Sequence, residues 1–314
     1  MSIGLLPGTP NQVEKSELAI KLGEAYFRQG DYQQARTMFE QALVISEKLQ
    51  DKDGTARALH SLGMLAQATG DYERARAFFE RSLAIKEEFG DLAGVAQTLH
   101  GLGMLAQATG DYERARAFFE HSLALNEELG DISGVAQTLH QLGIVSQSVG
   151  DLERAQAFLE RSLAIKEQIG DKHGVARTLH QLGMIAQDSG DYERAYRFFE
   201  HSLAIKEQLG DLQGEAQTLH QIGMLAYERG EYERARVLLE RSLAIREEIG
   251  DRNGVAIGLA QLALLEESKG NLETAYSLIS RAERIFSELG SPYVAQANRH
   301  RSRIAKRISS SGSI

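Results

Sequence analysis

Residues 91–130 read DLAGVAQTLHGLGMLAQATGDYERARAFFEHSLALNEELG, and close copies of this 40-residue block fill most of the chain. The block divides in two, since a Gly-Asp pair or a near variant recurs every 20 residues from Gly30 to Gly290. Ten of the fourteen junctions read Gly-Asp, and the others are Gln50-Asp51, Gly230-Glu231, Gly270-Asn271 and Gly290-Ser291. A period of this length predicts a stack of small repeated units rather than ordinary globular domains.

Each junction is expected to end one helix and begin the next. Glycine adopts the left-handed conformation that closes a helix, and aspartate or its substitutes accept hydrogen bonds from the free N–H groups of the following helix. The repeats contain no proline, so fifteen helices are expected, the last from Ser291 to about Ile308. We therefore predict an all-α solenoid of about seven helix-turn-helix repeats over residues 12–290, with a capping helix over 291–308. Residues 1–11 and 309–314 are predicted to be disordered.

Composition excludes several classes of protein. Of 314 residues none is cysteine, which excludes disulfides, thiolate catalysis and cysteine metal sites. A net charge of -9 argues against nucleic-acid binding, which needs a basic surface. The N-terminal stretch has neither a basic region nor a long apolar core, and no membrane span is visible. A cytoplasmic protein with no membrane partner is expected.

The apolar residues of one block lie on one face of each expected helix. In the first half, Val95, Leu99, Leu102 and Ala106 share an arc at 100° per residue. In the second half, apolar residues such as Phe119 form the corresponding face. Neither helix can bury its face alone, so each pair is expected to stack on its neighbours.

The spacing Leu99-x-x-Leu102-Gly103-x-x-Ala106, followed by Ala115-x-x-x-Phe119, resembles the tetratricopeptide repeat pattern. The 40-residue period is similar to the long repeats of Pins/LGN-type polarity adaptors and bacterial Rap-type peptide-sensing regulators. The resemblance covers about residues 12–290. It implies a right-handed superhelix, with a concave groove lined by the first helix of each repeat, in a protein that binds other proteins.

The residues expected to line that groove form columns from repeat to repeat. They stand six and three residues before the repeat glycine, and one and four residues after it. In chain order the columns are Arg57, Gln97, Gln137, Arg177 and Gln217; His60, His100, His140, His180 and His220; Met64, Met104, Ile144, Met184 and Met224; and Gln67, Gln107, Gln147, Gln187 and Tyr227.

These columns have a functional and a structural interpretation. Methionine adapts to varied partners, and glutamine and histidine can bind peptide backbone groups. Exposed histidines would also make acidic ligands bind more tightly at low pH. Alternatively, the histidines are hydrogen-bonded structurally and the methionines pack against the next repeat. Duplication alone copies any residue, and residues 62–80 are identical to 102–120.

No residue pattern indicates catalysis or a cofactor. The histidines of neighbouring repeats are expected to lie too far apart to share a metal ion. The stretch from Gly101 to Ala106 matches a dinucleotide-binding fingerprint, but it stands in mid-helix with no strand before it. The sequence favours a non-enzymatic scaffold that binds a peptide segment. A sensor that changes superhelical pitch on binding a small ligand or signalling peptide, and a solenoid that self-associates end to end, are the alternatives.

Overall fold

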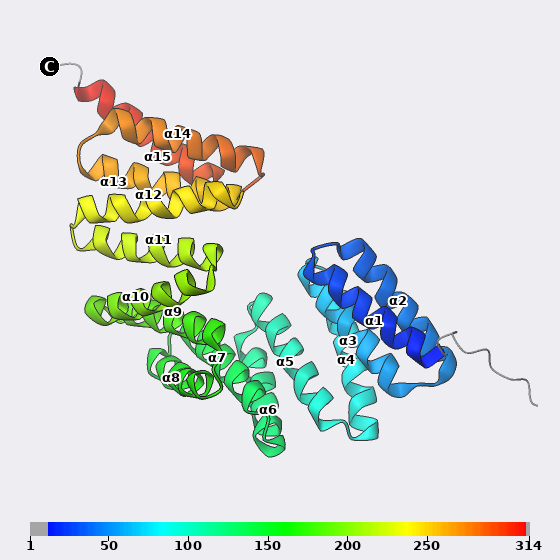
Figure 1. Ribbon diagram of the computed structural model, residues 1–314. Helices are drawn as coiled ribbons and strands as arrows, with labels where there is room; N and C mark the ends of the chain where they lie inside the picture. Colours follow the sequence, from blue (N-terminus) through cyan, green and yellow to red (C-terminus); the bar gives the residue numbers. More distant parts are fainter. Residues whose placement is uncertain (1–11, 312–314) are drawn as a thin grey trace, which may run out of the picture. The chain divides into compact units, whose positions relative to one another are not determined.

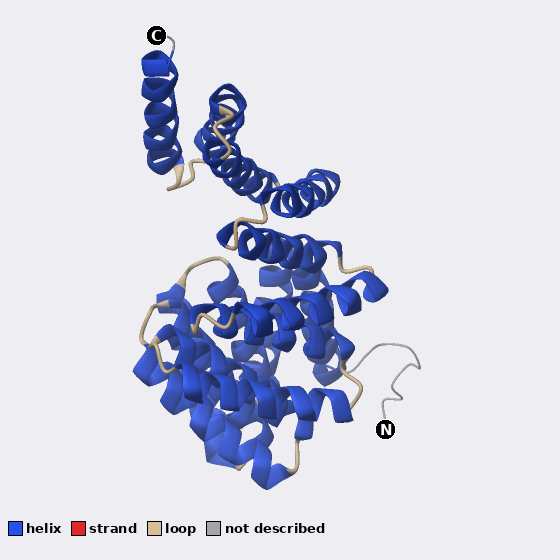
Figure 2. Cartoon of the chain, turned by 90° about the vertical axis from the view of Figure 1, so that its left-hand side faces the viewer, coloured by secondary structure: helices blue, strands red, loops and turns tan. Residues whose placement is uncertain are grey.

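The computed structural model describes residues 12–311, and all regular structure in this range is α-helical (Figure 1 and Figure 2). The first helices of the pairs, here called A helices, are α1 (Gln12–Arg28), α3 (Lys52–Ala68), α5 (Leu92–Ala108), α7 (Ile132–Ser148), α9 (Lys172–Asp188), α11 (Leu212–Glu228) and α13 (Arg252–Ser268). The second or B helices are α2 (Tyr32–Leu49), α4 (Tyr72–Phe89), α6 (Tyr112–Leu129), α8 (Leu152–Gln168), α10 (Tyr192–Leu209), α12 (Tyr232–Glu248) and α14 (Leu272–Glu288). The last helix is α15 (Val294–Ser311). The predicted seven antiparallel pairs and capping helix are confirmed.

The junctions end and begin helices by the expected chemistry. Gly90 has a φ of +77°, and the N–H of Asp91 donates to the carbonyl of Lys86 at 3.0 Å. The Asp91 side chain then accepts from the N–H of Gly94 at 2.9 Å. A single Gly-Asp pair thus satisfies backbone groups of both helices that it joins.

Two of the substitutes for aspartate behave differently from the prediction. Neither Glu231 nor Asn271 makes a side-chain hydrogen bond to the helix that follows it. The longer Glu231 side chain instead contacts Arg229 and Arg234, while Asn271 donates to Glu266 at 2.6 Å. Aspartate is therefore the effective cap at these junctions.

The repeat glycine allows the two helices of a pair to approach closely. A Cβ atom on Gly103 would stand 2.6 Å from the ring of Phe119, which is fully buried. On the same interface, the Ser122 hydroxyl donates to the Ala96 carbonyl at 2.9 Å. Both contacts recur in other repeats because the residues recur.

The chain forms two compact units, residues 1–165 and 166–314. In each unit, apolar clusters join a pair to the next A helix. In the first unit Ala115 and Phe119 pack with Leu142. In the second, Phe199 packs with Ile222 and other residues in the same way. The core is thus divided among the pairs, as the repeated sequence predicts.

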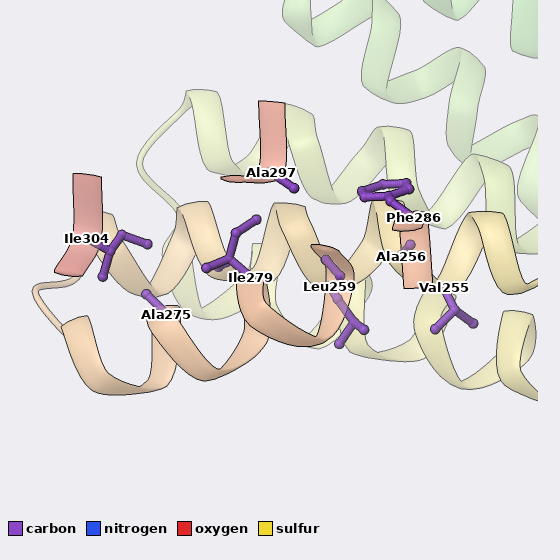
Figure 3. Packing of buried hydrophobic residues seen from close by; sticks show 10 residues of the cluster. Val255, Ala256, Leu259, Ala275, Ile279, Phe286, Ala297 and Ile304 are labelled. Carbon is purple, nitrogen blue, oxygen red and sulfur yellow. The ribbon is translucent and has the colours of Figure 1, made fainter. Parts of the chain in front are cut away.

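The capping helix α15 packs against α14. Ala297 and Ile304 of α15 are buried in one cluster with Ile279 and Phe286 of α14 (Figure 3). The helix starts three residues later than expected, and it runs to Ser311 through part of the predicted tail. There the hydroxyl of Ser309 donates to the Ala305 carbonyl at 3.0 Å, and the hydroxyl of Ser310 donates to the Arg307 carbonyl at 2.9 Å. Residues 1–11 and 312–314 lie outside the described residues.

Candidate functional site

The A helices carry a row of polar side chains six residues before the repeat glycine. Gln97, Gln137, Arg177 and Gln217 are exposed, whereas Arg57 is half-buried. Amide and guanidinium groups at the surface can bind the backbone or carboxylates of another chain. This row is the part of the predicted groove that is most accessible to a ligand.

The five histidines are buried or half-buried instead of being exposed, and three of them contact the next A helix. The Nδ1 atom of His100 lies 3.4 Å from the hydroxyl of Thr138, in the next A helix of the same unit. Its ring packs edge-on against Phe119, with centroids 5.2 Å apart. Equivalent histidine–threonine contacts join His60 to Thr98 at 3.3 Å and His180 to Thr218 at 3.1 Å. His140 is 4% exposed, and His220 is half-buried.

Burial keeps four of these imidazoles neutral. It lowers the pKa of His60, beside Lys86, and of His180, beside Lys206, to about 3. It lowers the pKa of His100 and His220 to about 4. The structural interpretation therefore holds for these four histidines, and tighter binding of acidic ligands at low pH, which required exposed histidines, is not expected of them. A wheel drawn for one helix omits the neighbouring repeat that covers the ring.

The methionines also contribute to packing between repeats. Met64 and Met104 are half-buried against the apolar clusters that contain Leu102 and Leu142 respectively. Met184 and Met224 pack in the same way in the second unit. Ile144 is half-buried at the equivalent position. The buried part of each of these methionine side chains therefore packs against the next repeat, as the structural interpretation predicts.

The residues four positions after the glycine are all half-buried. They are Gln67, Gln107, Gln147, Gln187 and Tyr227. The Oε1 atoms of Gln107 and Gln187 are buried without a hydrogen-bond partner, although the amide nitrogen of Gln187 lies 3.5 Å from Glu228. The Tyr227 hydroxyl lies 2.7 Å from that of Ser268. This column retains free acceptors at the edge of the packed core.

Near the ends of the B helices lies a column of buried cations that was not predicted from the sequence. Lys86, Lys166, Lys206 and Arg246 are at most 7% exposed. Lys206 Nζ donates to the Thr218 hydroxyl at 2.8 Å. Burial lowers the pKa of Lys166 and Lys206 to about 8. A lysine near a helix end is normally solvated. The signal in the sequence was the threonine on the apolar arc of the next helix, because a buried hydroxyl needs a hydrogen-bond partner.

Two cavities lie beside the A helices. In the first unit, a cavity of about 500 Å³ is lined by polar residues of α3, α5 and α7, among them Arg57, Gln97 and Gln137. In the second unit, a cavity of about 500 Å³ lies between α13, α14 and α15. Its lining is mostly apolar, since Ile257 and Leu264 replace the arginine or glutamine and the methionine of earlier repeats.

Two other kinds of site are not found in the described part of the chain. Within residues 12–311, no three histidine, aspartate or glutamate side chains are grouped so that they could hold a metal ion. In the same range, no helix has the length and apolar character required to cross a membrane.

The arrangement of helices is similar to several solved structures. The apo form of RapI matches with a TM-score of 0.67 at 17% identity, over 92% of this chain and 99% of RapI. A Rap protein complexed with Competence and Sporulation Factor has a TM-score of 0.60 at 14% identity, over 95% and 99% of the two chains. BtubC (BKLC) from P. vanneervenii has a TM-score of 0.63 at 24% identity, over 70% and 92%.

No curated protein matches the sequence significantly. The tetratricopeptide repeat profile does match, over residues 15–88, 94–168 and 174–248. These three segments cover more than half of the chain, and each contains helices of the A and B type. The chain belongs to the tetratricopeptide repeat family.

Proposed function

We propose that this chain is a non-enzymatic scaffold whose A helices bind a peptide segment of a partner protein. The observation that carries the proposal is the polar cavity in residues 1–165, because three successive A helices contribute to it. Arg57, Gln97 and Gln137 stand at equivalent positions on these helices. Their donors and acceptors suit the backbone of a chain that crosses the three helices.

The half-buried columns supply the remaining surface of the proposed groove. The solvent-facing parts of Met64 and Met104 offer adaptable apolar contact. Membership of the tetratricopeptide repeat family supports protein binding in general. The similarity to a Rap protein that holds Competence and Sporulation Factor supports a role for this fold in ligand binding.

Exposed side chains allow a test that spares the core. Peptides would be selected from a library on the wild-type protein, and their affinity measured for a variant carrying both Gln97→Ala and Gln137→Ala. We expect binding at least about tenfold weaker, or about 1.4 kcal/mol. Gln41→Ala, at an exposed position on the B helix α2 of the same unit, is the matched control. Selected peptides that bind the double variant as tightly as the wild type would overturn the proposal.

Ligand sensing is a second candidate, which the similarity to Rap proteins with and without a bound factor favours. A sensor is expected to become more compact when the selected peptide binds, whereas a rigid scaffold keeps its dimensions. Small-angle scattering of the full chain, with and without saturating peptide, separates the two. An unchanged radius of gyration would exclude this sensor mechanism.

A further inference from the structure

The buried cations of the B helices share one binding environment, which we call the amine socket. For Lys86 it consists of the Gly94 carbonyl, the Thr98 hydroxyl and the helix-capping carboxylate of Asp91. Lys86 Nζ donates to the first at 3.3 Å and to the second at 3.1 Å. Asp91 provides the largest opposing charge near the amine.

The same socket recurs along the chain with a cation in it. Lys166 donates to Thr178 at 2.9 Å, and Arg246 donates to the Gly254 carbonyl at 2.7 Å. In each case the helix-capping aspartate, Asp171 or Asp251, favours the charged form. The chain itself therefore demonstrates which chemical group this environment accepts.

One repeat has the socket without the cation, because Asn126 stands at the lysine position. The Nδ2 atom of Asn126 lies 2.8 Å from where a Cβ on Gly134 would stand. In Lys86 and Lys166 it is the Cδ atom that lies 2.8 Å from where a Cβ on the equivalent glycine would stand. Asparagine thus ends where lysine continues for two more atoms. Asn126 reaches the Thr138 hydroxyl only at 3.4 Å.

The space left by the shorter side chain belongs to the polar cavity of the first unit. Asn126, Thr138, Gly134 and Asp131 all line that cavity, whose volume is about 500 Å³. Gly134 is half-buried and Asp131 is exposed. Their equivalents in the lysine and arginine repeats are buried and half-buried respectively, so the Asn126 socket is more exposed than the others in the described residues. The Lys86 socket lines the same cavity, but its own amine fills it.

The hydrogen-bonding groups of the open socket are oriented for a donor. The Thr138 hydroxyl is fully buried and contacts Nδ1 of His100, the arrangement that His60 and Thr98 have beside Lys86. A neutral imidazole accepts the threonine hydrogen, and the threonine oxygen, which accepts only the long contact from Asn126, has a second lone pair for a ligand. Around the cavity, the carboxylates of Asp53, Asp91 and Asp131 outnumber the cations Arg57 and Lys86.

We propose that this cavity binds a primary alkylammonium group, whose nitrogen donates to Thr138 Oγ1 and the Gly134 carbonyl while Asp131 balances its charge. The group is either the side chain of a lysine in the bound peptide or a free amine. The first form rests on the proposed function, since Gln97 and Gln137 line the same cavity. The second does not depend on it.

The free-amine form is tested with n-butylammonium at constant ionic strength, followed by amide NMR shifts of the full chain. We expect saturable shifts at Gly134 and Thr138, and at least tenfold weaker binding to Asn126→Lys, whose own side chain fills the socket. Lys206→Asn should open a second socket and add saturable shifts at Gly214 and Thr218. Circular dichroism confirms that each variant is folded.

Two controls separate the socket from general attraction to an acidic protein. Tetramethylammonium carries the same charge but has no N–H donor, and n-butanol has the same chain length without charge. Neither is expected to produce the shifts. If tetramethylammonium is as effective as butylammonium, or if Asn126→Lys binds butylammonium like the wild type, the proposal is wrong.

The lysine form is tested with a selected peptide that contains lysine and with the same peptide acetylated at that lysine. We expect acetylation, and separately Asn126→Lys, to weaken binding at least tenfold. If neither acetylation nor Asn126→Lys weakens peptide binding, and no amine binds, the socket proposal is wrong but the scaffold proposal stands. Amine binding in a protein that selects no peptide supports the socket and overturns the scaffold.

Discussion

At the residue scale, positions that depart from the repeat are informative because the other repeats supply the reference. Gln50 is the only non-glycine residue with a positive φ, 55°, in the described part of the chain. The left-handed conformation costs a residue with a Cβ about 1 kcal/mol. We expect Gln50→Gly to raise the free energy of unfolding by about that amount. Urea denaturation measures it, and unchanged or lower stability would contradict the argument.

The reverse substitution at an equivalent junction is the control. Gly90 has a φ of +77°, and a Cβ there would meet no atom within 4 Å. Gly90→Gln is therefore expected to lower stability through backbone strain and not through a clash. A neutral result would mean that these junctions are not held in the left-handed conformation.

A second departure leaves a polar atom unpaired. Nδ1 of His220 is buried without a hydrogen-bond partner, because Gly258 stands where the other repeats have the threonine that contacts the preceding histidine. A Cβ on Gly258 would lie 3.4 Å from Leu243, which is ordinary contact. Gly258→Thr is expected to raise the free energy of unfolding. The rise should be about 1 kcal/mol larger than for the isosteric Gly258→Val, which cannot form the hydrogen bond. Equal stability of the two variants in thermal or urea unfolding would show that no hydrogen bond forms.

At the element scale, the repeat glycine decides how closely the two helices of a pair approach. A Cβ on Gly103 would stand 2.6 Å from the Phe119 ring, so Gly103→Ala is expected to cost about 2 kcal/mol through overpacking. Gly101→Ala, in the same helix, would meet the Phe79 ring at 3.0 Å, and sister repeats carry serine or glutamine there. We expect Gly101→Ala to be neutral or stabilising. Similar losses for both would contradict the role assigned to Gly103.

The sequence predicts elements well and the contacts between repeats poorly. The Gly-Asp pairs and their variants predict the fifteen helices of the described residues to within a few positions, because cap and stop chemistry act within a few residues. The wheel places Leu102 and Phe119 correctly, since they pack within or beside one pair. It does not reveal the burial of His100 and Lys206, whose polar groups contact threonines of the following A helix. The role proposed for Asn126 becomes evident only when the lysines at the equivalent positions are known to be buried.

At the scale of the whole molecule, buried histidines couple stability to pH in both compact units. His60 and His100 lie in the first unit, and His180 and His220 lie in the second. Unfolded histidine binds a proton below about pH 6.5, whereas burial lowers the folded pKa values to about 3 or 4. The stability that they contribute is fully present above pH 6.5, and it is lost as the pH falls toward the folded values.

We therefore expect the free energy of unfolding to fall by about 1 kcal/mol per buried histidine between pH 7.5 and pH 5.5. Carboxylates contribute little there because their unfolded pKa values lie near 4. Urea denaturation at the two pH values measures the difference. His180→Gln should reduce it by about one histidine's share. Wild-type protein that is equally stable at both pH values would mean that the imidazoles are not held neutral between the repeats.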